Sequence, residues 1–174
     1  MGETGELCVR GPTLFAGYYK EERTRTFDAE GFFHTGDLGW LDADGALHFV
    51  GRAKDVIKSA GANVAAAEVE AVLLAHPAVG AAYVVGVPDP ARGENVAAFV
   101  VPKAAVSEAD LLAHCRAQLA SYKVPRHLWL RAEHELPQKG SGKADKTALR
   151  AEAARLAGVT DGGEPRESRP ASKT

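Results

Sequence analysis

The sequence predicts an α+β protein, and two observations along the chain support this prediction. Residues 6–50 are rich in glycine and aromatic residues and contain short segments in which apolar and polar residues alternate, a period typical of strands. After Gly51 the pattern changes to helices that alternate with valine-rich strands. We therefore expect a β-rich fragment followed by a compact α+β domain with a short sheet and flanking helices.

The β-rich part contains two strands that we expect at residues 6–10 and 46–50. The segment Asp42-Ala43-Asp44-Gly45 precedes the second strand. Aspartate favours a turn and glycine accepts a positive φ, so residues 38–50 are predicted to form a β-hairpin. A few strands cannot bury their own apolar faces without a partner layer, and this part should therefore be the edge of a larger unit.

The second part, residues 55–157, has the size of a domain that folds independently, with a boundary near residues 52–55. His76-Pro77 should end one helix. The segment from Ser107 to Asp110 has capping-box spacing, and Leu111, Leu112, Cys115 and Leu119 share one face of the helix that follows. The predicted elements are helices at 66–75, from 107, and at 146–156, and strands at 79–87, 96–101 and 127–130.

Composition and charge exclude several classes of protein. The 174 residues are 45% hydrophobic and 25% charged, as in ordinary globular proteins. A net charge of −2, from 21 basic and 23 acidic residues, implies no overall attraction to nucleic acid or an anionic membrane. No segment resembles a signal peptide or a membrane span, so a cytoplasmic location is expected. Residues 158–174 hold almost no large apolar side chain and are predicted to be disordered.

Cysteine and histidine give no metal-binding pattern in the sequence. Cys8 and Cys115 lie far apart without C-x-x-C spacing, which argues against a zinc site or a disulfide and favours two reduced, buried thiols. The six histidines have no metal-ligand spacing, and no Ser-His-Asp or Cys-His arrangement can be assembled from them. We therefore predict no metal site in this chain.

Three segments could carry chemistry. In the first, residues 33–37, a polar turn is expected to break a strand and expose Asp37, although such turns are commonplace. The second, residues 51–61, is either a solvated linker or strand edge, or a phosphate-contacting segment that uses its long cationic side chains.

The third segment, residues 138–143, is a glycine-rich loop that carries Lys143 just before a helix. It is not a P-loop, because Pro137 and Ala144 occupy the positions where that motif requires glycine and serine or threonine. What remains is a lysine on a mobile loop, able to reach into a site formed elsewhere. The basic residues Lys139, Lys143, Lys146 and Arg150 lack the interleaved aromatic residues of a nucleic-acid site, and no nucleic-acid partner is expected.

The order of several short motifs is more informative than any one of them. The motifs are Gly5-Glu6-Leu7, Gly17-Tyr18-Tyr19, His34-Thr35-Gly36-Asp37, Gly51-Arg52-Ala53-Lys54-Asp55 followed by Ile57-Lys58 and Gly61, Glu68-Val69-Glu70, Tyr122-Lys123-Val124-Pro125, and Leu136-Pro137 with Ser141-Gly142-Lys143. This series resembles the later core motifs of the adenylate-forming superfamily of acyl-CoA synthetases, peptide-synthetase adenylation domains and luciferases. The resemblance covers residues 5–156.

The resemblance implies an AMP-forming acid–thiol ligase, in which a carboxylate attacks the α-phosphate of ATP and a thiol then displaces AMP from the acyl-adenylate. Asp37 would bind the ribose hydroxyls, which suits a carboxylate that accepts two hydrogen bonds. Arg52 would support the same ribose. Lys143 matches the adenylation lysine, whose ammonium stabilises the charge that develops between the substrate carboxylate and the α-phosphate.

The resemblance also implies a lid that rotates between the two half-reactions. Lys54 falls at the family's hinge. Lys58, with the loop Ser59, Ala60 and Gly61, matches the segment that replaces Lys143 at the site during thioester formation. Ala60 and Ala62 stand where many acyl-CoA ligases have glycine and glutamate, and Ala66 replaces a common proline. Lys58 and Gly61 resemble the coumarate-ligase and luciferase types. This resemblance favours CoA over a carrier-protein thiol, and it implies a fatty or aryl acid as the substrate.

The family pattern divides the chain into the end of the large adenylating domain (residues 1–53), a C-terminal lid domain (54–157) and a tail (158–174). ATP or AMP, CoA and Mg²⁺ are the implied cofactors. The phosphate loop, the acyl pocket and the Mg²⁺ ligands are expected upstream, so the isolated chain should be inactive and its partner should be the missing N-terminal adenylating domain. Whether Met1 is a natural start is left open. The alternative is a truncated, non-catalytic interaction or regulatory module.

Overall fold

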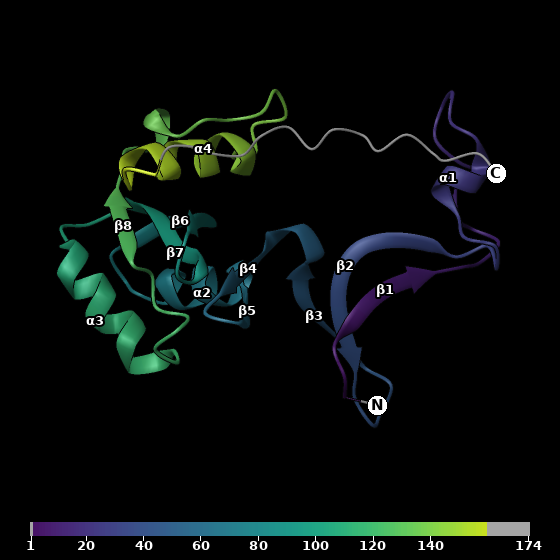
Figure 1. The fold of residues 1–174 in the computed structure, drawn as a ribbon, viewed down its shortest axis with the longest axis horizontal. Helices are drawn as coiled ribbons and strands as arrows, with labels where there is room; N and C mark the ends of the chain where they lie inside the picture. The colour runs from purple at the N-terminus through teal and green to yellow at the C-terminus, as the bar shows by residue number, and fades with distance from the viewer. Residues whose placement is uncertain (1, 160–174) are drawn as a thin grey trace.

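The computed structural model describes residues 2–159, which form two sheets joined by a short 3-10 turn (Figure 1). Gly158 and Val159 belong to the predicted disordered tail, but their amides donate hydrogen bonds to the carbonyls of Arg155 and Ala154 in the last turn of the final helix. Gly158 has a φ of +72°, the conformation in which glycine commonly ends a helix. The prediction of disorder is wrong for these two residues, and the rest of the predicted tail lies outside the described residues.

The first sheet is antiparallel, with strand order β1 (Gly5–Val9), β2 (Phe33–Leu41) and β3 (Leu47–Arg52). A short helix, α1 (Arg23–Thr26), lies between β1 and β2. The predicted hairpin is confirmed: Asp42 Oδ1 accepts hydrogen bonds from the amides of Asp44 and Ala46, and Gly45 has a φ of +80°. The aspartate side chain thus closes the turn that joins β2 to β3.

The polar turn predicted at residues 33–37 is instead an irregularity inside β2. Cys8 pairs with His34 and Glu6 with Leu38, so β2 supplies extra residues at this point, and Gly36 takes a φ of +70°. The Thr35 hydroxyl donates to the carbonyl of Leu7 and accepts from the amide of Asp37, which holds the bulge in place. The turn prediction was wrong because a glycine at positive φ occurs in bulges as well as in turns.

The second sheet has the order β5-β4-β7-β6, with β8 pairing parallel to β7. Its strands are β4 (Val56–Ser59), β5 (Ala62–Ala65), β6 (Val79–Asp89), β7 (Gly93–Pro102) and β8 (His127–Leu130). Strands β6, β7 and β8 were predicted, with shorter bounds for β6 and β7. The β4–β5 hairpin was not predicted, because the alternating charged and apolar residues of 51–61 also fit a linker.

Helices cover both faces of this second sheet. Helices α2 (Ala66–Leu74) and α3 (Glu108–Gln118) pack on one face, with Val84, Val96 and Val100 of the sheet in the same buried cluster. Helix α4 (Lys146–Leu156) packs on the other face against Val85 and Phe99. Successive residues of β6 and β7 point to opposite faces, which explains why both strands are nearly continuous runs of valine and alanine. The predicted α+β fold is therefore confirmed. Before α4, a 3-10 turn at Glu133–Glu135 leads into the loop that precedes this helix.

The β-rich part lacks a comparable core, as the sequence predicted. Seven of its large apolar side chains are exposed: Val9, Phe15, Tyr18, Tyr19, Leu41, Leu47 and Phe49. Cys8 is also exposed, so the prediction of two buried thiols holds for Cys115 alone. Burial raises the pKa of the Cys115 thiol to about 11. Within residues 2–159 no helix combines the length and the apolar character needed to cross a membrane.

Replacement of Ser107 by alanine should lower the free energy of unfolding by about 1 kcal/mol, because it removes the N-cap of α3. The Ser107 hydroxyl and the Asp110 amide, 3.1 Å apart, form one half of a capping box. Chemical denaturation of the variant measures the loss. Replacement of Ser121, an exposed turn serine, is the matched control and should change the stability by less than about 0.5 kcal/mol. Equal losses in the two variants would show that the cap contributes nothing specific.

Candidate functional site

Asp37 and Arg52 are brought together where β2 and β3 pair. They are cross-strand partners, and Arg52 Nε lies 2.8 Å from Asp37 Oδ1. The same oxygen makes no hydrogen bond within residues 2–159, so the N–H of Arg52 does not point at it and charge alone holds the pair. This oxygen is itself buried, so only the exposed part of the carboxylate can meet a further donor.

Lys54 lies in the 3-10 turn Ala53–Asp55, the only connection between the two sheets in the described chain. Its side chain is exposed. The neighbouring Asp55 is tied to the second part, because Lys146 Nζ lies 3.8 Å from Asp55 Oδ2 and 2.9 Å from Glu70 Oε1. Glu70 Oε1 also accepts from the amide of Val84, so the start of α4, helix α2 and strand β6 meet at one carboxylate.

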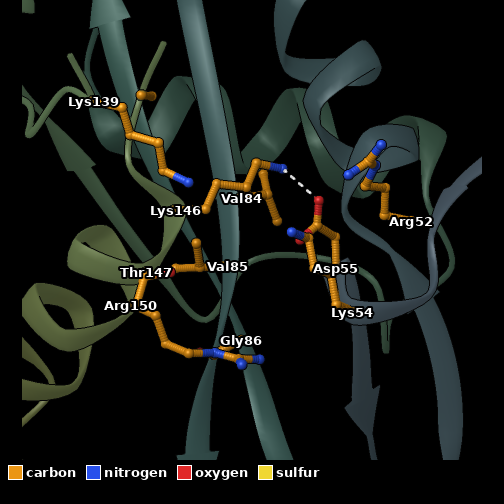
Figure 2. Close-up of a pocket in the computed structure, with 11 residues that line it drawn as sticks. Arg52, Lys54, Asp55, Val84, Val85, Gly86, Lys139, Lys146, Thr147 and Arg150 are labelled. Carbon is orange, nitrogen blue, oxygen red and sulfur yellow. Dashed lines mark hydrogen bonds and ion pairs between the residues drawn. The ribbon is translucent and has the colours of Figure 1, made fainter. Parts of the chain in front are cut away.

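A cavity of about 400 Å³ opens beside this connection (Figure 2). Figure 2 shows Lys139 and Arg150 on one side of it, Arg52 and Lys54 on the other, and Lys146 between them, reaching towards Asp55. The residues that line it are Arg52, Lys54, Asp55, Val84, Val85, Gly86, Lys139, Ala144, Lys146, Thr147 and Arg150. Five of these side chains are cationic.

Some of the cavity's positive charge is already compensated. Arg150 pairs with Glu94 at 2.7 Å, and Lys146 pairs with Glu70. Lys54 and Lys139 form no ion pair within residues 2–159, so their charge is available to an anionic ligand. From the sequence, Lys139, Lys146 and Arg150 are considered only as part of a nucleic-acid site, which is not favoured, and they receive no role in the nucleotide site. The spacing of residues 146 and 150 on one helical face was the available signal.

Lys143 lies on the loop that joins the 3-10 turn Glu133–Glu135 to α4. The loop is closed by hydrogen bonds from the amide of Lys139 to the carbonyl of Lys143 and from Gly142 to Lys139. Lys143 is exposed and does not line the cavity, although its neighbour Ala144 does. In Figure 1 the loop projects beyond α4 on the side where the three-stranded sheet lies.

Lys58 and the segment 59–61 lie at the end of the β4–β5 hairpin. Ser59 pairs with Ala62, so Ala60 and Gly61 form the two-residue turn, with φ values of +53° and +79°. Positive φ at both positions is the type I′ turn that suits a hairpin, and it strains Ala60, which carries a Cβ atom. Lys58 is exposed, and its amide donates to Glu94 Oε2.

A second cavity, of about 280 Å³, borders this turn and shares no lining residue with the first. It is lined by Ser59, Arg92, Val96, Ser121, Tyr122, Val124 and Arg126. The buried Nε of Arg92 has no hydrogen-bond partner within residues 2–159. The loop of Lys143 and the turn after Lys58 therefore border different cavities of the same α+β domain.

Glu6, Cys8, His34 and Asp28 form a cluster on the first sheet that the sequence did not reveal. His34 Nδ1 lies 2.9 Å from Glu6 Oε2, and its Nε2 lies 3.4 Å from Asp28 Oδ2. The hydrogen bond between His34 and Glu6 lowers the pKa of Glu6 and raises the pKa of His34. The pKa of Asp28 is lowered chiefly by a hydrogen bond from the amide of Phe32.

Comparison with known proteins shows a match between residues 68–143 and the AMP-binding enzyme C-terminal domain family. A 2-succinylbenzoate-CoA ligase of Bacillus cereus is 43% identical over 147 residues, which are 84% of this chain and 30% of the relative. A sulfoacetate-CoA ligase of Cupriavidus necator is 43% identical over 152 residues, 85% of this chain and 30% of the relative. The chain thus spans about a third of the length of these relatives.

Two solved structures of one protein, MatB from Rhodopseudomonas palustris, resemble the fold to different degrees. The ATP-bound structure is 36% identical and gives a TM-score of 0.78, covering 89% of this chain and 31% of that chain. The apo structure is 37% identical, again covering 89% of this chain and 31% of that chain, and gives a TM-score of 0.65. The fold of this chain as a whole is thus more similar to the ATP-bound structure.

Replacement of Glu6 by glutamine should lower the pKa of His34, because the imidazolium loses an anionic hydrogen-bond acceptor. The raised pKa of His34 stabilises the fold below its unfolded pKa of about 6.5, and the lowered pKa of Glu6 does so above its unfolded value of about 4.3. The pair therefore contributes fully to the free energy of unfolding between about pH 4.3 and 6.5. This contribution is lost as the pH rises through the raised pKa of His34 or falls through the lowered pKa of Glu6. NMR titration of the His34 ring measures the shift, and Glu3→Gln is the control that should leave it unchanged.

Replacement of Ala60 by glycine should raise the free energy of unfolding by up to about 1 kcal/mol, because glycine adopts the left-handed conformation without strain. Ala62→Gly, two residues later in β5, should instead lower it by about 0.5–1 kcal/mol. Denaturation of both variants distinguishes the two effects. A loss of stability in Ala60→Gly comparable to that in Ala62→Gly would contradict the strained turn.

Proposed function

We propose that this chain supplies the lid and part of the nucleotide site of an ATP-dependent acyl-CoA ligase. The chain belongs to the adenylate-forming superfamily and corresponds to its C-terminal portion. The observation that carries the proposal is the Asp37–Arg52 pair beside a cavity with five cationic side chains, next to the loop of Lys143. The division into residues 1–53, 54–157 and 158–174 is part of the proposal.

The proposed reaction has two displacements. A carboxylate oxygen of the acid attacks the α-phosphorus of ATP, and the bond to the bridging oxygen breaks to release pyrophosphate. The sulfur of CoA, after loss of its proton, then attacks the acyl carbon, and AMP leaves with the electrons of the acyl–oxygen bond. Negative charge develops in the transition state of both steps. Cationic side chains placed close to that charge lower the activation barrier.

Asp37 suits the ribose because its carboxylate can accept two hydrogen bonds from vicinal hydroxyls. Its side chain is 28% exposed, and its Oδ1 has no hydrogen bond in the described chain. Arg52 would hold this carboxylate in position and remain close enough to contact the ribose itself. The bulge at residues 35–37 sets where the carboxylate points.

Lys143 would act in the first displacement by bridging the attacking carboxylate and the α-phosphate. Its loop ends at Ala144 on the rim of the cationic cavity, where Lys54 and Lys139 form no ion pair with any residue of the described chain.

Lys58 and the turn Ser59, Ala60 and Gly61 would act in the second displacement, after rotation at Lys54. Lys54 lies in a three-residue turn between two strands, the kind of position that absorbs large φ/ψ changes. The separate cavities beside Lys143 and Ser59 support a lid that presents one face for each half-reaction.

The proposed substrates are ATP, CoA and a carboxylic acid, for which a fatty or aryl acid is our expectation. The relatives of similar identity are named for different acids, which supports selection of the acid by residues outside this chain. The Glu6, Cys8 and His34 cluster offers sulfur and nitrogen, whereas Mg²⁺ prefers oxygen ligands, so it does not fit the Mg²⁺ implied by the family. Mg²⁺ ligands are still expected upstream, and the cytoplasmic location stays a prediction.

The alternative is a non-catalytic interaction module, and the exposed apolar side chains of the first sheet favour it. Val9, Leu41, Leu47 and Phe49 are each more than 40% exposed. The same surface is expected if the sheet continues into an adenylating domain. An ATP–pyrophosphate exchange assay on the complete protein separates the two, since an interaction module catalyses no exchange.

Replacement of Lys143 by alanine in the complete protein should lower the rate of ATP–pyrophosphate exchange by about a hundredfold or more, since it removes a charge that acts in the transition state. Replacement of Lys58 by alanine should leave this exchange within about threefold and lower the rate of CoA thioester formation from the preformed acyl-adenylate. Single-turnover assays of each half-reaction measure the two effects.

Lys103→Ala is the matched control, because Lys103 is an exposed lysine beyond β7 and lines neither cavity. It should leave both half-reactions unchanged. Unchanged pyrophosphate exchange in Lys143→Ala would refute the role of Lys143, and equal loss of both steps in Lys58→Ala would refute a lid with two faces.

A further inference from the structure

We propose that Glu6, Cys8 and His34 form a binding site for Zn²⁺ or a similar borderline divalent cation, supported by Asp28. Each of the three offers one ligand atom, and these atoms all lie within 4.8 Å of one another. The site is separate from the nucleotide and lid residues described above and does not depend on the proposed function.

The distances suit a tetrahedral cation. A Zn–S bond of about 2.3 Å and a Zn–N bond of about 2.0 Å at a tetrahedral angle set sulfur and nitrogen about 3.5 Å apart. Cys8 Sγ and His34 Nδ1 are 3.5 Å apart. The corresponding N to O separation is about 3.3 Å, and Glu6 Oε2 lies 2.9 Å from His34 Nδ1, so the carboxylate needs to move by only about 0.4 Å.

Asp28 completes a pattern common around metal-bound histidines. Its Oδ2 lies 3.4 Å from Nε2 of His34, on the far side of the ring from Cys8 and Glu6. A carboxylate that accepts a proton from one ring nitrogen leaves the lone pair of the other free for the metal and orients the ring. Asp28 is itself held by the amides of Glu30 and Phe32, which donate to its Oδ1 and leave Oδ2 for His34.

The backbone holds the three ligands together without a metal. Cys8 and His34 are paired residues of β1 and β2, and Glu6 precedes Cys8 by two positions, on the same face of β1. Oxygen Oε1 of Glu6 accepts from the amide of Gly36, whereas Oε2 faces His34. Binding through Oε2 therefore leaves the hydrogen bond to the bulge intact.

The chemistry of the donors selects the class of cation. A thiolate and an imidazole favour Zn²⁺ and similar ions over Mg²⁺ and Ca²⁺. One thiolate and one carboxylate neutralise the two charges of Zn²⁺. The side chains of His34 and Glu6 are 50% and 38% exposed, so the cation has a path of entry and water can occupy a fourth position.

Titration of the untagged 174-residue chain with Zn²⁺ by calorimetry should show one saturable site per chain. Cys8→Ser and His34→Gln should each weaken binding by at least about tenfold, and Asp28→Asn should weaken it by about 10–100-fold. Co²⁺ should give a thiolate charge-transfer absorption that Cys8→Ser abolishes. The thermal midpoint of each variant without metal shows whether it is folded.

His48→Gln is the matched control, because His48 is an exposed histidine that is likewise paired with a carboxylate, Asp42, 2.7 Å away. It should leave the Zn²⁺ affinity unchanged. The proposal is overturned if the chain shows no saturable site, if folded Cys8→Ser binds Zn²⁺ as tightly as the unchanged chain, or if His48→Gln weakens binding as much as His34→Gln.

Discussion

The long pairing of β6 with β7, buried on both faces, sets the geometry of the α+β domain. Ten residue pairs join the two strands, with Val84 facing one helical layer and Val85 the other. Every other strand of this sheet and all three of its helices are positioned by this ladder. Because α4 is held against Val85, Val87 and Phe99, the loop that carries Lys143 ends at a fixed point.

Charge pairs couple the functional loops to that core. Lys146 connects the start of α4 to Glu70 of α2, which also accepts the amide of Val84. Glu94 of β7 accepts from the amide of Lys58 and pairs with Arg150. The segment after the hinge and the helix after the Lys143 loop are thus tied to neighbouring points of one sheet. A rotation at Lys54 would move both loops as one body, which is the property that an alternating lid needs.

The first sheet is stabilised by different interactions from those of the second. It has little buried apolar surface of its own, and its order depends on short polar contacts, among them the Thr35 hydroxyl with Leu7, Asp42 with its turn, and Glu6 with His34. A bulge in β2 places Asp37 opposite Arg52 on one side and His34 opposite Cys8 on the other. One local irregularity therefore shapes both the ribose-binding pair and the candidate cation site.

The order of the family motifs and most of the elements could be predicted from the sequence, including α2, α3 with its capping box, α4 and the β2–β3 hairpin. These features are local: period, caps and turn residues lie within a few positions of one another. Three contacts became visible only in the folded chain. Arg52 and Lys54 share a cavity with Lys139 and Arg150, Lys146 pairs with Glu70, which is 76 residues away in the sequence, and Cys8 contacts His34. Such meetings depend on strand register and on the bulge at Gly36, which a local pattern does not encode.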